Sequence, residues 1–129
     1  AKSGVDVRIL TPHIPDKKIV FEITRGFYKQ LVEAGVKIYE FTPGFNHTKN
    51  FVADDSLAIV GSANTDYRSY FLHYENGCLM YKTSEIRKIK QNFLDACEKS
   101  HLVTLDEIHK TNVIVRMIRA VLNLMIPLV

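Results

Sequence analysis

The first 41 residues constrain the fold most strongly, because they predict a strand, a helix and a second strand joined by short links. Apolar and polar residues alternate over residues 4–10, as in a half-buried strand. Residues 17–34 repeat apolar side chains at helical spacing, with Asp16 as the expected N-cap and Gly35 as the stop. Residues 36–41 predict the next strand. Such strands pair in parallel through a right-handed crossover, so we expect an α/β fold, a mixed β-sheet flanked by helices on both faces.

A β-hairpin is predicted next, by two apolar runs at residues 51–53 and 57–62 that are separated by residues 54–56. We expect the turn to be centred between the two aspartates of the intervening segment. With that register, the residues before the first run lie opposite those after the second. His47 then lies opposite Ser62.

His47, Lys49, Ser62 and Asn64 would therefore form a small polar cluster. In a strand, His47 and Lys49 point to the same face. An imidazole serves as a nucleophile or general acid and base near neutral pH, and donors around it suit an anionic phosphodiester. The sequence places no second metal-type ligand at suitable spacing, so we expect neither a metal nor a cofactor.

Taken separately, these short motifs are common, since His-x-Lys is usually a solvated strand and Gly-Ser-x-Asn a turn. Together, His47, Lys49, Asp54 and then Gly-Ser-x-Asn at residues 61–64 resemble the active-site motif of the phospholipase D superfamily. The sequence around the motif looks like the C-terminal half of a bacterial cardiolipin synthase. This resemblance covers essentially the whole chain. The resemblance implies a phospholipase D-like fold and phosphatidyl transfer.

By this resemblance, His47 attacks phosphorus in phosphatidylglycerol and forms a covalent phosphohistidine. The equivalent histidine of a second motif would protonate the leaving alcohol and deprotonate the acceptor. The acceptor would be a second phosphatidylglycerol, which gives cardiolipin and glycerol. The synthases carry two motifs and this chain carries one. We therefore expect the second motif from an N-terminal half or from a homodimer partner, and an incomplete site in the isolated chain.

The supporting roles also follow from the resemblance. Lys49 and Asn64 would hold the nonbridging phosphate oxygens, with Ser62 assisting. Glu75, in a strand predicted over residues 70–82, would hydrogen-bond the catalytic imidazole and orient it. The family motif counts Asp54 with the site, although its position in a turn favours a structural role.

The C-terminal part of the chain predicts helices. One is expected from residues 83–84 to about His101, and a capping box at residues 104–107 starts a short second helix. We expect residues 1–110 to form a single phospholipase D-like domain. Residues 111–129 predict an apolar helix with a narrow polar stripe, which either packs on the domain or a partner or lies in the membrane interface.

Composition limits the partners only mildly. The chain has 129 residues and a formal net charge of +3, which is too small to indicate nucleic-acid binding. No apolar run is long enough to span a bilayer, so we expect peripheral contact with an anionic membrane surface at the cytoplasmic side of a bacterial cell membrane. Because the first residues already lead into a strand, we expect no signal peptide and a domain excised from a longer protein.

Other functions stay open from the sequence. A phosphodiesterase or nuclease of the same superfamily could pair two single motifs in a homodimer. A non-catalytic half-domain that packs and docks on membranes would also explain the single motif. A kinase-like or metal-dependent phosphate enzyme is disfavoured, since the sequence has neither a Gly-rich loop nor a carboxylate cluster.

Overall fold

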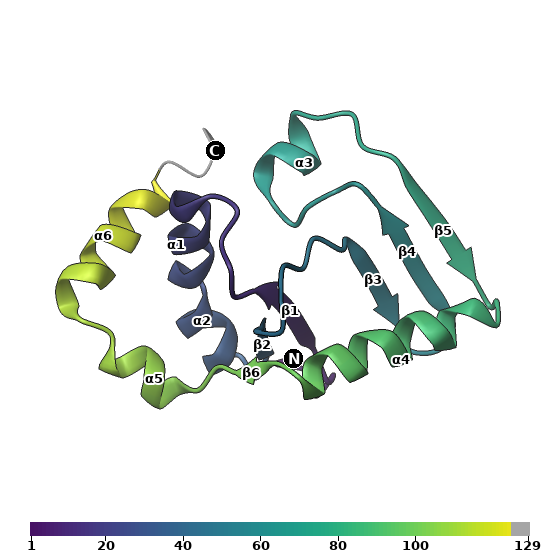
Figure 1. Cartoon of the computed structure of the whole chain (residues 1–129), viewed down its shortest axis with the longest axis horizontal. Helices are drawn as coiled ribbons and strands as arrows, with labels where there is room; N and C mark the ends of the chain where they lie inside the picture. The colour runs from purple at the N-terminus through teal and green to yellow at the C-terminus, as the bar shows by residue number, and fades with distance from the viewer. Residues whose placement is uncertain (125–129) are drawn as a thin grey trace.

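The computed structural model describes residues 1–124, which form an α/β fold of two small sheets and surrounding helices (Figure 1). None of the helices in this part of the chain is long and apolar enough to cross a membrane. In chain order the elements are β1 (Arg8–Pro12), α1 (Lys18–Gly26), α2 (Tyr28–Glu33), β2 (Lys37–Phe41), β3 (Asn50–Ala53), β4 (Leu57–Gly61), α3 (Tyr67–Phe71), β5 (Gly77–Tyr81), α4 (Glu85–Glu98), β6 (His101–Leu102), α5 (Leu105–Lys110) and α6 (Val113–Asn123).

The first sheet has the strand order β1-β2-β6. Strand β1 pairs in parallel with β2, from Arg8 opposite Lys37 to Pro12 opposite Phe41, so the expected crossover is confirmed. Strand β1 begins four residues later than the alternation at residue 4 indicated. The antiparallel edge strand β6 was not predicted, because two residues are too short to show a period.

The predicted helix over residues 17–34 is two helices, α1 and α2, that meet at Phe27. The Phe27 amide donates to the Thr24 carbonyl at 3.1 Å, which tightens the end of α1. Lys17 occupies the N-cap position and no side chain caps the helix, so the expectation for Asp16 was wrong. Gly26 precedes the break, and a glycine favours a helix end more than a helix interior.

The core of the first sheet lies between β2 and the helices α2 and α5. Tyr28, Val36, Ile38 and Val103 form its buried cluster, and Ile108 packs against them. Alternation along β2 buries Ile38 on this face. Burial raises the pKa of the Tyr28 phenol to about 12.

Glu40 is the buried carboxylate of β2, with 3% of its surface exposed. Arg25 donates to both of its oxygens, at 2.9 and 2.7 Å, and His13 Nδ1 lies 2.8 Å from Oε2. Burial by itself raises the pKa of Glu40, but the hydrogen bonds from Arg25 and His13 outweigh it and hold this pKa below its usual range. The charge is therefore buried only because it is paired.

The second sheet is antiparallel, with the order β3-β4-β5. The predicted hairpin is confirmed, but Ala53 pairs with Leu57 and Asn50 with Val60, so the register differs by one residue from the expected one. Helix α4 runs along both sheets (Figure 1), and Ile86 of α4 and Ala58 of β4 have no exposed surface. The expected mixed sheet is thus divided into two, which one helix joins.

One strand prediction and one helix prediction after the hairpin need correction. The strand expected over residues 70–82 is helix α3, a loop and strand β5, and α4 ends at Glu98, before His101. The capping box is confirmed, because Thr104 accepts from the Glu107 amide while the Glu107 side chain accepts from the Thr104 amide. Helix α6 covers much of the predicted C-terminal helix, and residues 125–129 of that prediction lie outside the described residues.

Candidate active site

His47 and Lys49 lie in an extended segment between β2 and β3 rather than in a strand. The prediction that strand alternation points both to one face therefore does not hold, because β3 begins only at Asn50. The His47 imidazole is exposed and stacks on Phe45, with 5.6 Å between ring centroids. The Lys49 ammonium donates to the His47 carbonyl oxygen at 2.9 Å. This bond ties the two motif residues together through the backbone.

The end of β4 lies beside this segment. The Gly61 amide donates to the Lys49 carbonyl at 3.1 Å, so the ladder of β3 and β4 continues past the regular strands. Because the turn contains three residues, Lys49 rather than Thr48 lies opposite Gly61 at this strand end. The first and last parts of the motif are thus adjacent, although the expected pairing of His47 with Ser62 was wrong by one residue.

Ser62 and Glu75 form the best-connected part of the site. The Ser62 hydroxyl donates to Glu75 Oε2, and its oxygen accepts from the Asn76 amide at 3.0 Å. The Ser62 amide donates in turn to the Asn76 carbonyl at 2.9 Å. Hydrogen bonds from Ser62 and Ser69 lower the pKa of Glu75, and His73 and Lys49 act in the same direction. Glu75 therefore carries its negative charge among donors.

Glu75 was expected inside a strand and hydrogen-bonded to the imidazole. It lies instead in the loop before β5, and its partner in this structure is Ser62 rather than His47. Its other oxygen, Oε1, is not used in that bond. Sequence parity could not have identified this contact, since α3 and its loop replace the strand on which the parity was counted.

Gly61 is needed where β4 meets the start of β5. A Cβ atom at this position would overlap the Asn76 carbonyl oxygen and lie 2.8 Å from Gly77 Cα. Such approaches to backbone atoms cannot be relieved by moving a flexible side chain. The glycine thus permits the close packing that brings Ser62 to Asn76.

Asn64 is held by helix α3, whose last two residues had been expected to begin a strand. Asp66 is the N-cap residue of α3 and accepts from the Ser69 amide at 2.7 Å. The buried Ser69 hydroxyl accepts from the Asn64 amide at 3.1 Å. Ser69 is a positioning residue that the sequence reasoning missed, although an Asp three residues before it is a capping signal. Arg68 donates to His73 Nε2 at 3.2 Å.

Asp54 lies in the turn between β3 and β4, as expected from its residue type. Its φ of 53° is in the left-handed region, which Asp tolerates better than most residues. His47 and Asn64 lie beyond the opposite ends of the two hairpin strands. The structure therefore separates Asp54 from the other motif residues, and a structural role in the turn is the one that its position favours.

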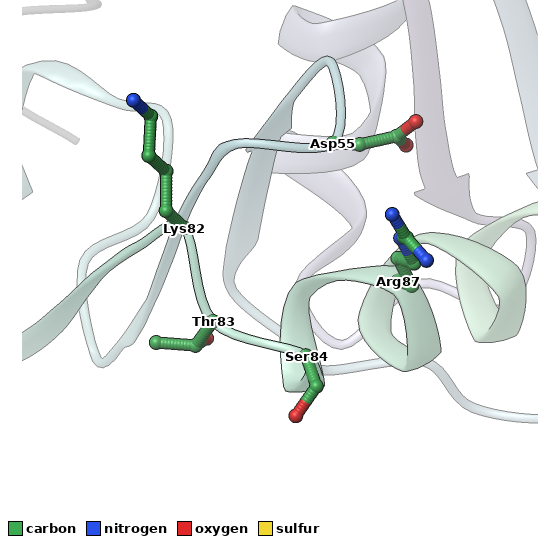
Figure 2. Close-up of a pocket in the computed structure, with 5 residues that line it drawn as sticks. All are labelled: Asp55, Lys82, Thr83, Ser84 and Arg87. Atoms are coloured by element: carbon green, nitrogen blue, oxygen red, sulfur yellow. The ribbon is translucent and has the colours of Figure 1, made fainter.

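A hollow of about 370 Å³ lies at the turn end of the hairpin and is lined by Asp55, Lys82, Thr83, Ser84 and Arg87. Figure 2 shows Arg87 pointing toward Asp55 and Lys82 pointing away from it. This hollow lies beside Asp54 but away from His47 and Ser62, because Ser62 follows the other end of β4. Within residues 1–124, no group of three or more His, Cys, Asp or Glu side chains is placed to hold a metal ion.

The segments around one end of the β3-β4-β5 sheet thus supply four polar groups: the exposed imidazole of His47, the ammonium of Lys49, the hydroxyl of Ser62 and the amide of Asn64. The carboxylate of Glu75 lies beside Ser62. A nucleophile beside several donors suits attack on an anionic phosphorus centre, since the donors stabilise the added negative charge. The donors come from the chain itself and are held by backbone hydrogen bonds. This arrangement supports phosphoryl chemistry at the His47 end of the hairpin.

Comparisons with known proteins agree with this chemistry. A family model described as the cardiolipin synthase, PLD-like domain matches residues 1–97. Cardiolipin synthase 2 of Bacillus anthracis is 41% identical over 128 residues, which are 99% of this chain and 25% of the relative. Cardiolipin synthase of Geobacillus kaustophilus is also 41% identical, over 99% of this chain and 26% of its own length. An uncharacterized protein of Streptococcus mutans is 44% identical, over 99% of this chain and 28% of its own length.

The chain thus spans about a quarter of the length of the curated relatives that it matches. The family model covers the segment from β1 to the last turn of α4, which includes every motif residue discussed above. On this match, the chain belongs to the phospholipase D-like domain family of cardiolipin synthases.

Proposed function

We propose that this chain is the C-terminal catalytic part of a phosphatidyltransferase of the cardiolipin synthase type, with His47 as the nucleophile. The observation that carries the proposal is the exposed His47 imidazole at the strand end where Lys49, Ser62 and Glu75 come together. The match to cardiolipin synthases supports phosphatidylglycerol as the substrate.

In the first step, an imidazole nitrogen of His47 attacks the phosphorus of phosphatidylglycerol. The bond from phosphorus to the glycerol oxygen breaks, and the released alkoxide takes a proton from the histidine of a second motif. This leaves a phosphatidyl group on His47 and that second histidine deprotonated. No redox change occurs, and no cofactor is needed for the balance of the step.

In the second step, the hydroxyl of a second phosphatidylglycerol attacks the same phosphorus and gives its proton to the second histidine. The bond between phosphorus and nitrogen breaks, which yields cardiolipin and restores both histidines, the glycerol having left in the first step. The second motif would come from an N-terminal half of a longer polypeptide or from another copy of this chain. The greater length of the relatives leaves room for such a half.

The remaining motif residues have supporting roles in this proposal. Lys49 and Asn64 would hold the nonbridging oxygens, with Ser62 assisting, because ammonium, amide and hydroxyl donors stabilise the charge of the transition state. Glu75 would orient the imidazole through the oxygen that Ser62 does not occupy. Asp54 would act on the hairpin turn rather than on substrate.

The reaction would take place at an anionic membrane surface, where phosphatidylglycerol is supplied, on the cytoplasmic side of a bacterial cell. The test is direct detection of the covalent intermediate. The chain is incubated with phosphatidylglycerol vesicles and a chelator, quenched without acid, and digested. Mass spectrometry then looks for a phosphatidyl adduct on the peptide that carries His47. Reactions with His47→Gln and with His73→Gln are run in parallel.

An adduct in the native chain and in His73→Gln, but not in His47→Gln, would support the assignment. If the adduct forms only after the N-terminal half of a full-length relative is added, the chain holds half a site. An adduct on another residue, or none with either preparation, would overturn the role of His47. Transfer to water in place of phosphatidylglycerol would instead identify a phosphodiesterase of the same superfamily.

A further inference from the structure

Helix α6 packs against α1 through its polar stripe, the reverse of an ordinary surface helix. Arg119 donates to Glu22 of α1 at 2.8 Å, and only 14% of the Arg119 side chain is exposed. Asn123 lies so close to Gly26 that a Cβ atom there would be 2.9 Å from the Asn123 amide. Two of the three polar residues of the helix, Arg119 and Asn123, therefore face the protein, whereas Arg116 is exposed.

Six apolar residues of α6 and its C-cap are consequently exposed, whereas Val115 and Leu122 are half-buried. Between 52% and 80% of the surface of each of the six is exposed, in a stripe with spacings of one, three and four residues: Val113, Ile114, Met117, Ile118, Val121 and Leu124. These six side chains expose roughly 600 Å² together, at the upper end of what monomeric soluble proteins leave uncovered in one patch. A surface helix normally buries such a stripe. We call these six residues the outer stripe.

Helix α6 carries basic residues and no acidic residue of its own. No acidic residue lies between Glu107 and Val129, and the exposed Arg116 and Lys110 belong to none of the ion pairs formed within residues 1–124. Two cations beside an apolar stripe, with no acid on the helix, match an apolar surface that carries negative charge. A bilayer with anionic headgroups has this combination.

We propose that the outer stripe of α6 docks into the interfacial region of an anionic lipid bilayer, with the helix axis in the membrane plane. The eleven residues of α6 are about 16 Å long, about half the thickness of a bilayer core, so an in-plane position is the one that buries the stripe. Arg116 and Lys110 would then lie at the headgroups. The pair of Arg119 with Glu22 would keep the helix oriented on α1.

A second copy of the chain fits this surface less well. A stable protein interface needs about 800 Å² from each partner, more than the outer stripe exposes. The same helix of another copy also has no acidic side chain to pair with Arg116. The proposal goes beyond the catalytic one and does not depend on it, because it involves no motif residue.

The test uses tryptophan reporters, since the chain contains no tryptophan. Met117→Trp places one in the outer stripe, and Asn92→Trp places a control on the exposed side of α4. Each variant is mixed with vesicles of phosphatidylcholine alone or with phosphatidylglycerol added, some with brominated acyl chains. We expect a blue shift and bromine quenching for Met117→Trp on the anionic vesicles, and neither for Asn92→Trp.

A charge substitution supplies the second measurement. Ile118→Glu should weaken vesicle binding by about tenfold or more, because it removes an apolar contact and adds repulsion from the headgroups. Leu79→Glu makes the same kind of change at an equally accessible site on β5, 64% exposed, and should leave binding unchanged. Circular dichroism checks that both variants keep the fold, which surface substitutions at these sites should preserve.

Three outcomes would overturn the proposal. The first is equal binding by the native chain and Ile118→Glu. The second is equal binding to neutral and anionic vesicles. The third is a blue shift of Met117→Trp without lipid that grows with protein concentration, together with a dimer by light scattering, since the stripe would then be an interface between copies. A missing His47 adduct would leave this result intact, because vesicle binding is measured without turnover.

Discussion

Replacing the buried Glu40 by glutamine tests whether the ion pair at the carboxyl end of β2 stabilises the fold. Glu40→Gln keeps the shape of the side chain but removes its charge. Arg25 and His13 then both lose their carboxylate partner, which Arg25 contacts through both oxygens and His13 at 2.8 Å. Because 28% of the Arg25 side chain is exposed, water can solvate part of the released charge.

Breaking a fully buried ion pair by removing one partner costs about 3 to 5 kcal/mol. With the partial exposure of Arg25, we expect Glu40→Gln to lower the free energy of unfolding by about 2 to 4 kcal/mol at pH 7. Urea unfolding followed by far-ultraviolet circular dichroism measures it. The control is Glu33→Gln, whose partner Lys29 is 3.8 Å away in an exposed pair; its loss should be below about 0.5 kcal/mol.

The same substitution has a pH signature. The folded pKa of Glu40 is lowered, so the stability from its charge is present above the unfolded pKa of about 4.3 and is lost as the pH falls through the folded pKa. The difference between the native chain and Glu40→Gln should therefore shrink between pH 5 and the acid limit of folding. A loss below 0.5 kcal/mol at pH 7, or a difference that stays constant on acidification, would refute the reasoning.

Three further substitutions test other contacts. Gly61→Ala should lower the free energy of unfolding by about 2 kcal/mol in urea, because its methyl group would overlap the backbone of Asn76. Tyr28→Phe removes the bond to Thr11 at 2.8 Å and should cost about 1 kcal/mol at pH 7. The Tyr28 pKa is raised to about 12, so the stability that the protonated phenol contributes to the fold is complete below pH ~10 and is lost as the pH rises through about 12. Alkaline unfolding followed by circular dichroism should therefore be weaker in Tyr28→Phe. Thr104→Ala breaks the capping box and should cost about 1 kcal/mol in the same urea assay.

Matched variants control for nonspecific effects of these changes. Gly44→Ala adds the same methyl group where nothing lies within 4 Å and should be nearly neutral. Tyr74→Phe removes a phenol that is fully exposed and should not alter alkaline unfolding. Thr65→Ala changes an exposed threonine that caps no helix. Equal losses in a variant and its control would contradict the contact assigned to that residue.

Much of the first sheet and the identity of the motif could be predicted from the sequence. The period of residues 36–41 and the helical repeat before it led to the parallel pairing of β1 with β2, because crossover handedness leaves few alternatives. The capping box at Thr104 was equally readable, since its two hydrogen bonds join residues three apart. The spacing of His47, Lys49 and the later Gly-Ser-x-Asn led to the family that the comparisons show.

The hairpin register and the partner of Glu75 could not be read in this way. Whether two or three residues make the turn changes the local energy little, but it decides whether Lys49 or Thr48 lies opposite Gly61 at the end of β4. Glu75 meets Ser62 only because α3 replaces part of a predicted strand. That helix depends on a buried Ser69 and its contact with Asn64, which no periodicity reveals.

Over much of the chain, helices and strands follow from contacts between residues a few positions apart, and these could be read from the sequence. How the segments face one another depends on contacts between distant residues, which the sequence pattern does not show. Helix α6 is the clearest case, because its pattern of apolar and polar residues was plain while its orientation was not. Arg119 reaches Glu22, 97 positions earlier. That distant ion pair, together with the close approach of Asn123 to Gly26, turns Arg119 and Asn123 inward and leaves the outer stripe exposed.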